Sequence, residues 1–212
     1  MICAATIRQS ALFPGLMGIL LLIATGAPTG ALAEAESPDV IVSEIFAELL
    51  AELDALRADN SLDANSARAV FGRLLNPRID YDSLARWILR DHWKNASEEQ
   101  RSKFLAAFKA YIINTYSLAL SSEQEIALDV EPNPTIKKNT AVVDAKFAAE
   151  DGDRIPLQFR MIQRNGSWLL FDVSFAGVSL ALTFRSDFNY VAGDGGIDAV
   201  TSHLVQRAGG GT

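Results

Sequence analysis

The sequence contains few of the residues from which catalytic and metal sites are usually built. Its 212 residues include one cysteine, Cys3, and two histidines, His92 and His203. Histidines, cysteines and acids do not cluster at the spacing that metal ligands require. The chain has no G-x-S-x-G elbow, and its glycine cluster near residue 195 lacks the lysine of a phosphate-binding loop. These absences disfavour metal-dependent, nucleotide-dependent and serine-hydrolase chemistry.

Acidic residues are absent from the first 33 positions. Arg8, an apolar run over residues 12–24 and the tripeptide Ala31-Leu32-Ala33 together match a secretory signal peptide that is removed after Ala33. The apolar run is shorter than the roughly 20 residues of a membrane span. Because Cys3 precedes this run, it does not occupy a lipidation site. The mature chain therefore has no cysteine, and a packed core must stabilise it without disulfides.

Basic residues are also scarce relative to acidic ones. The chain has 19 lysines and arginines against 26 acids, a formal net charge of −7. This balance disfavours binding to nucleic acid and stable adsorption to anionic lipid surfaces. No second hydrophobic segment approaches the length of a membrane span, so we expect a soluble exported protein. The expected organisation is a leader over residues 1–33, a single domain over 34–207 and a disordered tail over 208–212.

Apolar residues recur at helical spacing through the first half of the chain. The longest predicted helix begins at a capping box formed by Ser97 and Gln100. One stripe of that helix carries bulky side chains that either pack on a core or form the wall of a cavity, and the sequence leaves both interpretations open. The residues of this stripe are Leu105, Phe108, Ile112 and Tyr116, with Phe104 and Tyr111 beside them. The predicted helices cover residues 38–59, 63–75, 79–89, 97–121 and, near the C-terminus, 197–206.

From residue 129 the apolar period changes from helical to two, which is typical of half-buried antiparallel strands. The predicted strands cover residues 141–147, 155–161 and 168–175. A hairpin loop is expected over residues 150–153, and Asn165-Gly166 is a strong turn signal before the third strand. Helices followed by such a meander predict an α+β domain, with one face of the sheet buried under helices.

The stretch over residues 166–188 is strongly apolar and has only three charged residues, Asp172, Arg185 and Asp187. Strict alternation in its strand directs Leu169, Phe171, Val173 and Phe175 inward and Asp172 away from the apolar side. Asp172 and Arg185 flank the turn at Gly177, so we predict a structural ion pair between them. Contact with a lipid headgroup is the alternative role for this pair.

With these residues in view, the chain resembles the periplasmic lipid-binding proteins of the toluene-tolerance family, typified by MlaC. The matching pieces fall in order over residues 76–204, which is most of the mature chain. They are Trp93-x-x-Ala96-Ser97-x-x-Gln100-Arg101-x-x-Phe104-x-x-x-Phe108, then Tyr116, then Gly166-x-Trp168-x-x-x-Asp172-Val173-x-x-x-Gly177-Val178-Ser179-Leu180, then Arg185-x-x-Phe188 and Gly196-Ile197-Asp198. The chain departs from the family where Arg90 and Asp91 replace a usual glycine. It also has Phe171 and Phe184 where tyrosine is common.

This resemblance implies a helix-rich N-terminal half packed on a curved antiparallel sheet of the nuclear transport factor-like kind, enclosing an apolar pocket. It implies a monomeric periplasmic carrier, without a cofactor, whose cargo is a phospholipid held by its acyl chains. The implied partners are an inner-membrane ABC transporter with an MCE-domain subunit and an outer-membrane lipoprotein–porin complex. The predicted lipid-binding residues are Leu105, Phe108, Ile112, Tyr116, Val143, Phe147, Leu157, Phe159, Met161, Phe171, Val173, Val178 and Leu180.

A carrier for a two-chain lipid needs a deep apolar cavity, near the upper end of the usual range at about 1,000 Å³. Small Ala141 and Ala145, alternating with Val143, are expected to leave such room beneath the helix that carries Phe108 and Ile112. The same residues suit a filled core equally well.

Three alternatives remain open at this level. The same family has a branch associated with hopanoids, whose cargo would be a rigid polycyclic lipid. A cone-shaped isomerase-like or dehydratase-like enzyme could use Asp144 or Asp172 as a general base, although the alternation directs both carboxylates away from the apolar side. An exported interaction module with a filled core would bind no lipid at all.

Overall fold

The computed structural model describes residues 36–120, 127–148, 154–193 and 195–209. They belong to one compact unit, which covers residues 35–212. The predicted leader over 1–33, the predicted hairpin loop over 150–153 and the last three residues of the predicted tail, 210–212, lie outside the described residues.

The helices follow the apolar periodicity of the sequence closely. They are α1 (Pro38–Ala58), α2 (Ala64–Leu74), the short 3₁₀ helix η1 (Asn76–Arg78), α3 (Tyr81–Leu89), α4 (Asp91–Asn95), α5 (Glu98–Leu120), α6 (Leu180–Ala192) and α7 (Gly196–Gly209). The five predicted helices are therefore confirmed to within a few residues at their ends, and α7 continues to Gly209. The capping box is confirmed too, because the Ser97 N–H donates to Gln100 Oε1 at 3.0 Å and the Gln100 N–H donates to Ser97 Oγ at 3.1 Å. None of the helices in the described ranges combines the length and hydrophobicity that crossing a membrane requires.

The strands form one antiparallel sheet in the order β1-β3-β4-β5-β6, with β2 pairing to β3. The strands are β1 (Ala127–Val130), β2 (Thr135–Lys137), β3 (Thr140–Ala148), β4 (Arg154–Arg164), β5 (Ser167–Phe175) and β6 (Val178–Ser179). The three longest are the three strands that the period of two predicts. The α+β class is therefore confirmed.

The apolar run after Gly177 has a structure that the sequence interpretation left unassigned, because it is the helix α6. Its buried residues Ala181, Phe184, Phe188 and Ala192 recur every three or four positions, which is the helical period. Ser179 is its N-cap and accepts a hydrogen bond from the Leu182 N–H at 3.0 Å. The turn at Ala176-Gly177 connects β5 to β6, and α6 begins directly after β6.

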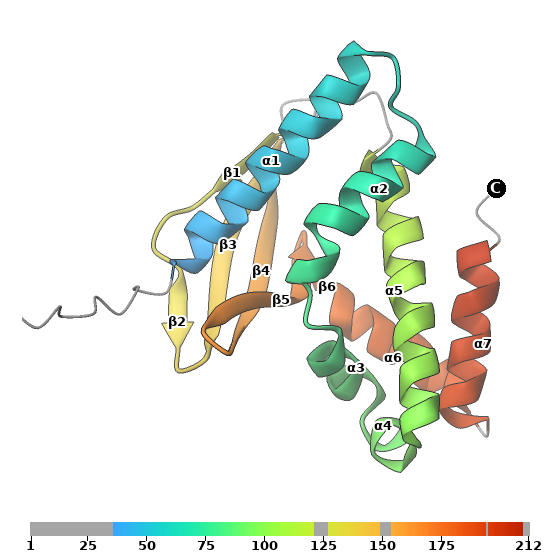
Figure 1. Ribbon diagram of the computed structural model, residues 1–212. Coiled ribbons are helices and arrows are strands. Elements are labelled where there is room, and N and C mark those ends of the chain that lie inside the picture. The colour runs from blue at the N-terminus through green and yellow to red at the C-terminus, as the bar shows by residue number, and fades with distance from the viewer. Residues whose placement is uncertain (1–35, 121–126, 149–153, 194, 210–212) are drawn as a thin grey trace, which may run out of the picture. The chain divides into compact units, whose positions relative to one another are not determined.

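Two main hydrophobic cores result from this arrangement. In one, Ile41 and Val42 of α1 pack on Val143 and Phe159 of the sheet. Figure 1 shows α1 lying across the strands and α5 running beside α7. The second core lies among the helices α2 to α7. It is rich in aromatic rings, with Phe108 at its centre.

Candidate functional site

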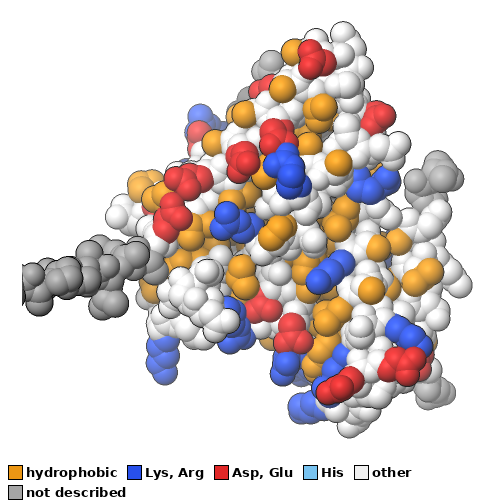
Figure 2. All heavy atoms as spheres, in the orientation of Figure 1, with side chains coloured by type: hydrophobic (Ala, Val, Ile, Leu, Met, Phe, Trp, Pro, Cys, Tyr) orange, Lys and Arg blue, Asp and Glu red, His pale blue; other side chains and the backbone are white. Residues whose placement is uncertain are grey.

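An apolar cavity of about 310 Å³ lies where these two cores meet, and it is partly open to solvent. The sheet core contributes Phe159 and Met161 to its lining, and the helical core contributes Ile112 and Phe184. In Figure 2 hydrophobic side chains are visible between α1 and the elements below it, with charged side chains around them. The complete lining is Val42, Ile45, Phe46, Leu49, Phe71, Leu75, Arg78, Ile79, Leu84, Ile112, Tyr116, Leu157, Phe159, Met161, Leu170, Phe171, Asp172, Val173, Leu180, Ala181 and Phe184.

A β-bulge in β5 shapes one wall of the cavity. Arg160 of β4 pairs with Asp172, whereas the next residue, Met161, pairs with Leu170. Phe171 is therefore an extra residue without a partner across the sheet. A bulge interrupts strict alternation, so Leu170, Phe171 and Val173 can all contribute to the cavity lining. The bulge also changes which residues of β5 lie on each face of the sheet.

The register pairs Asp172 with exposed Arg160 and Val173 with buried Phe159, so Asp172 lies on the face of β5 opposite to Val173, as the alternation predicts. It is nevertheless buried, with 6% of its surface exposed, and it borders the cavity. The predicted ion pair with Arg185 is wrong. The carboxylate accepts hydrogen bonds from the Ser179 hydroxyl at 2.7 Å and from the Ala181 N–H at 3.0 Å. Arg185 instead places its guanidinium over the ring of Trp87, 5.4 Å from the centroid.

The inward positions predicted for Leu169 and Phe175 also change. Phe175 is 43% exposed at the end of β5, and the buried ring near the start of this strand is Trp168. Leu170, rather than Leu169, contributes to the cavity lining. The bulge at Phe171 shifts the alternation by one residue in the part of β5 that precedes it, which explains Leu169, whereas Phe175 keeps the predicted register and is exposed at the end of the strand.

The structure brings together eight of the thirteen predicted lipid-binding residues around the cavity. These are Ile112, Tyr116, Leu157, Phe159, Met161, Phe171, Val173 and Leu180. They come from α5, β4, β5 and α6, elements that are distant in the sequence. Their contact with a lipid remains a prediction.

The other five predicted residues do not contribute to the cavity lining. Phe108 is fully buried in the helical core, and Leu105 packs against that core. Val143 is fully buried in the sheet core. Phe147 packs its ring on Phe175 with centroids 6.3 Å apart, and Val178 is 60% exposed at the turn before α6. Apolar character alone did not separate a cavity wall from a filled core or an exposed turn.

The longest helix combines both interpretations that the sequence left open for it. Its first turns carry Phe104 and Phe108, whose rings lie 5.4 Å apart inside the helical core. Further along the same helix, Ile112 and Tyr116 reach the cavity. Burial raises the pKa of the Tyr116 hydroxyl to about 12, with neighbouring Tyr111 as a smaller cause. This hydroxyl therefore stays neutral at physiological pH.

The empty space expected above the small residues of β3 is occupied by packed side chains. Ala141 and Ala145 are buried, and the apolar residues packed over them include Ile41 and Val42 of α1. The expected cover was the helix that carries Phe108. With α1 in that place, the cavity is displaced toward β4 and β5, and its volume is smaller than the expected 1,000 Å³.

Sequence reasoning missed the contributions of α1 and of the segment between α2 and α3. Val42, Ile45, Phe46 and Leu49 of α1 line the cavity, and their helical spacing marks them as a buried face. That spacing cannot show whether such a face covers a core or a cavity. Arg78 in η1 is the single lysine or arginine among the lining residues described.

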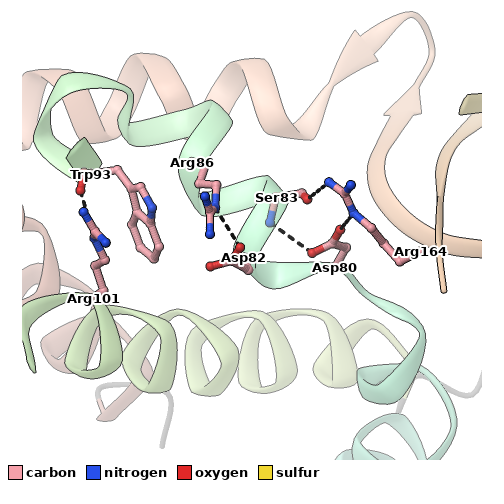
Figure 3. Close-up of polar contacts among 7 residues, drawn as sticks. All are labelled: Asp80, Asp82, Ser83, Arg86, Trp93, Arg101 and Arg164. Carbon is pink, nitrogen blue, oxygen red and sulfur yellow. Dashed lines mark hydrogen bonds and ion pairs between the residues drawn. The ribbon is translucent and has the colours of Figure 1, made fainter. Parts of the chain in front are cut away.

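A network of polar side chains fixes η1 and α3 against the sheet (Figure 3). Asp80 accepts hydrogen bonds from the Ser83 N–H at 3.0 Å and from Arg164 Nε at 3.2 Å, and Arg164 also donates to the Ser83 hydroxyl at 2.7 Å. Burial alone would raise the pKa of the Asp80 carboxyl, but the hydrogen bonds from Ser83 and Arg164 outweigh burial and hold that pKa below its usual range. The Asp80 N–H donates to the Leu170 carbonyl at 2.8 Å, next to the bulge.

The family motif around Trp93 has a structural role. Arg101 Nε donates to the Trp93 carbonyl at 3.0 Å, and its guanidinium lies 5.4 Å from the centroid of the Trp93 ring (Figure 3). The Trp93 ring packs edge-on against Phe104. These residues join α4 to α5 at the end of the helical core, outside the cavity lining.

The carboxylates considered for an enzyme are not placed as general bases in this structure. Asp144 is exposed on β3, where it accepts a hydrogen bond from Gln158 Nε2 at 2.9 Å, and it is not among the cavity residues. Asp172 reaches the cavity, but both of its oxygens accept hydrogen bonds from the start of α6. Across the described ranges no group of three or more histidine, cysteine or acidic residues is arranged to hold a metal ion.

Comparison with known proteins identifies relatives along most of the chain. The family model described as MlaC protein matches residues 43–206. The chain is 26% identical over 155 residues to toluene tolerance protein ttg2D of Pseudomonas putida, covering 73% of this chain and 72% of that protein. It is 23% identical over 176 residues to the intermembrane phospholipid transport system binding protein MlaC of Haemophilus influenzae, covering 81% of this chain and 82% of that protein.

The fold has a counterpart among solved structures. A phospholipid-binding protein from Ralstonia solanacearum, solved in complex with a phospholipid, superposes with a TM-score of 0.73 and 19% sequence identity. The match covers 82% of this chain and 98% of that protein. At this identity the likeness establishes the fold.

Proposed function

Because this chain belongs to the MlaC family, we propose that it is a lipid carrier that binds the acyl chains of a phospholipid in its apolar cavity. The observation that carries this proposal is the cavity itself, whose walls are almost entirely aliphatic and aromatic side chains. The phospholipid bound by the structural relative from Ralstonia solanacearum supports the same cargo. Asp172, the carboxylate on the wall, holds α6, which favours a binding protein over an enzyme.

The energetics explain why such a carrier is needed. A lipid with two acyl chains exposes roughly 30 methylenes in water, and at about 0.8 kcal/mol each the cost is on the order of 25 kcal/mol. Shielding even part of that surface lowers the barrier to moving a lipid between two membranes. A cavity of about 310 Å³ lies at the lower end of the range of ligand sites, so two whole chains require it to widen.

The proposal includes the location and the route. The chain is exported to the periplasm by the leader over residues 1–33 and acts there as a monomer. It receives or delivers lipid at an inner-membrane ABC transporter with an MCE-domain subunit and at an outer-membrane lipoprotein–porin complex. N-terminal sequencing of the exported protein tests the leader, and the expected first residue is Glu34.

Protein purified without detergent, extracted with organic solvent and analysed by mass spectrometry tests the cargo. Phospholipid in near-stoichiometric amount supports the proposal. A polycyclic lipid in its place would identify the hopanoid alternative. Lipid-free protein that also fails to take up labelled phospholipid from vesicles would show that the cavity does not carry lipid, as expected of an interaction module.

A further inference from the structure

Arg78 differs from every other residue of the cavity lining. It is the only lysine or arginine there, it is exposed, and its side chain makes no hydrogen bond or ion pair with any other part of the chain that the structure describes. Its neighbours Leu75 and Ile79 belong to the apolar lining on either side of it. A cationic group is therefore held at the edge of an otherwise apolar cavity, with its aliphatic stem against the wall and its guanidinium toward water.

The lack of a side-chain partner for Arg78 within the described ranges is notable because nearby arginines have one. Arg73 pairs with Glu52, Arg86 pairs with Asp82 at 2.7 Å, and Arg164 pairs with Asp80 at 3.2 Å. In a chain with a net charge of −7, a solvent-exposed arginine has many possible acidic partners. The guanidinium of Arg78 remains available for an external anion.

The backbone fixes the position of this cation. The Arg78 N–H donates to the Leu75 carbonyl at 3.0 Å, and Ile79 forms a bridge with Leu170 of β5. The next residue, Asp80, is held by Ser83 and Arg164 and by its own N–H bond to Leu170. Arg78 is therefore anchored beside the bulge that shapes the cavity wall, and it does not lie in a free loop.

We propose that Arg78 binds the phosphate group of the lipid headgroup while the acyl chains occupy the cavity. A guanidinium presents two parallel N–H donors that match the oxygens of a phosphate, and such charge-assisted pairs are about twice as strong as neutral hydrogen bonds. The anionic group on the wall does not oppose this role, because Asp172 is directed to Ser179 and the Ala181 N–H. The inference rests on the proposed function, and it makes Arg78 the residue that distinguishes a phospholipid from a neutral lipid with the same chains.

The test compares two lipids that differ only in the headgroup. Delipidated protein is offered an equimolar mixture of phosphatidylglycerol and diacylglycerol with identical acyl chains, and the bound lipids are quantified by mass spectrometry. We expect the wild type to be enriched in phosphatidylglycerol. In Arg78→Gln this enrichment falls on the order of tenfold, because the phosphate no longer distinguishes the two lipids, and in Arg78→Lys it falls less. Arg160→Gln is the matched control, because Arg160 is an exposed arginine of β4 outside the cavity lining.

The outcomes separate this inference from the proposed function. Unchanged enrichment in Arg78→Gln, with folding confirmed by circular dichroism, overturns the role of Arg78 and leaves the carrier function standing. A wild type that binds neither lipid overturns the carrier function itself. An excess of inorganic phosphate should leave loading with phosphatidylglycerol unchanged. Displacement by phosphate would identify a site for a free anion and contradict the proposal.

Discussion

The carboxylate of Asp172 accepts a hydrogen bond from the Ser179 hydroxyl at 2.7 Å, and this contact joins the bulged strand β5 to the start of α6. Ser179 in turn caps α6 by accepting from the Leu182 N–H, and the second Asp172 oxygen accepts from the Ala181 N–H. A negative charge at a helix N-terminus is also favoured by the helix dipole. Two elements that both contribute to the cavity wall are thus held together by one buried carboxylate.

Replacement of Asp172 should therefore destabilise the fold. Asp172→Ala is expected to lower the free energy of unfolding by about 3 kcal/mol, because it leaves the Ala181 N–H and the Ser179 hydroxyl buried without an acceptor. Asp172→Asn, which retains an acceptor oxygen, should cost less. Urea unfolding followed by circular dichroism measures both. Arg185→Gln is the control and should cost less than about 1 kcal/mol, since the interaction that its guanidinium makes within the described residues is with the ring of Trp87. If Asp172→Ala and Arg185→Gln lowered the free energy of unfolding equally, that result would support the ion pair predicted from the sequence.

The turn between β5 and β6 depends on backbone conformation. Ala176 and Gly177 have φ of 50° and 80°, in the region that two-residue hairpin turns require and that a side chain disfavours. A β-carbon at Gly177 would meet no atom within 4 Å, so the cost of Gly177→Ala comes from the backbone alone and is expected at about 1–2 kcal/mol. Ala176→Gly should instead stabilise the protein.

The same glycine-to-alanine substitution at Gly72 is a control for the turn at Gly177. Gly72 lies inside α2, and a β-carbon there also meets nothing within 4 Å. Gly72→Ala should raise the free energy of unfolding by about 1 kcal/mol, because alanine is the better helix former. The same substitution is thus expected to have opposite signs at residues 72 and 177. Thermal unfolding of the two variants checks this, and equal signs would contradict the role of positive φ.

Filling the cavity should block loading without unfolding the protein. Val173 lies on the cavity wall, and Val173→Trp places a large ring in space that a filled core would not provide. We expect lipid uptake to fall several-fold while stability changes by less than the 1–3 kcal/mol typical of overpacking in a filled core. Val205→Trp on α7 is the control, since Val205 is 58% exposed and outside the cavity. Full loading of Val173→Trp would show that lipid binds elsewhere.

Phe108 should behave as a core residue. Its ring lies 5.4 Å from the rings of both Phe104 and Phe184, and 5.7 Å from that of Phe188. Phe108→Ala is expected to cost about 3–5 kcal/mol of stability, so any loss of lipid follows from unfolding. Calorimetry, together with lipid measured per folded molecule, separates the two effects. A folded Phe108→Ala that no longer retains lipid would support the original prediction that Phe108 binds the cargo.

The Asp80 network should make stability sensitive to acid. The pKa of Asp80 is lower in the folded protein than in the unfolded chain. The ionised carboxylate therefore makes its full contribution to the free energy of unfolding above the unfolded pKa of about 3.9. That contribution is lost as the pH falls through the lower folded pKa. The stability difference between wild type and Asp80→Asn should therefore be constant from pH 7 to about pH 5 and should shrink below about pH 4. Midpoints of urea unfolding measured across this pH range test the prediction. A stability difference between wild type and Asp80→Asn that grows in acid would contradict it.

The sequence by itself determined the class of this fold and most of its long elements, with the exception of α6. The helical period of α1, the capping box of Ser97 and Gln100, and the period of two in β3 and β4 are local properties of the chain. They predict helices and strands with little reference to the rest of the molecule. The motifs that carry the family resemblance are also read from the sequence directly, and the family is confirmed.

Only the tertiary structure decided which apolar faces enclose space. Phe108 and Ile112 lie on one helix at the same spacing, yet Phe108 fills a core and Ile112 reaches the cavity, because different elements pack against each. The helix that packs over β3 is α1 rather than α5, and the cavity therefore lies toward β4 and β5. The bulge at Phe171 brought Leu170, Phe171 and Val173 together on the cavity wall, and η1 placed Arg78, whose side chain has no polar partner among the described residues, at the cavity edge. Each of these results depends on contacts between segments far apart in the sequence, and periodicity carries no information about such contacts.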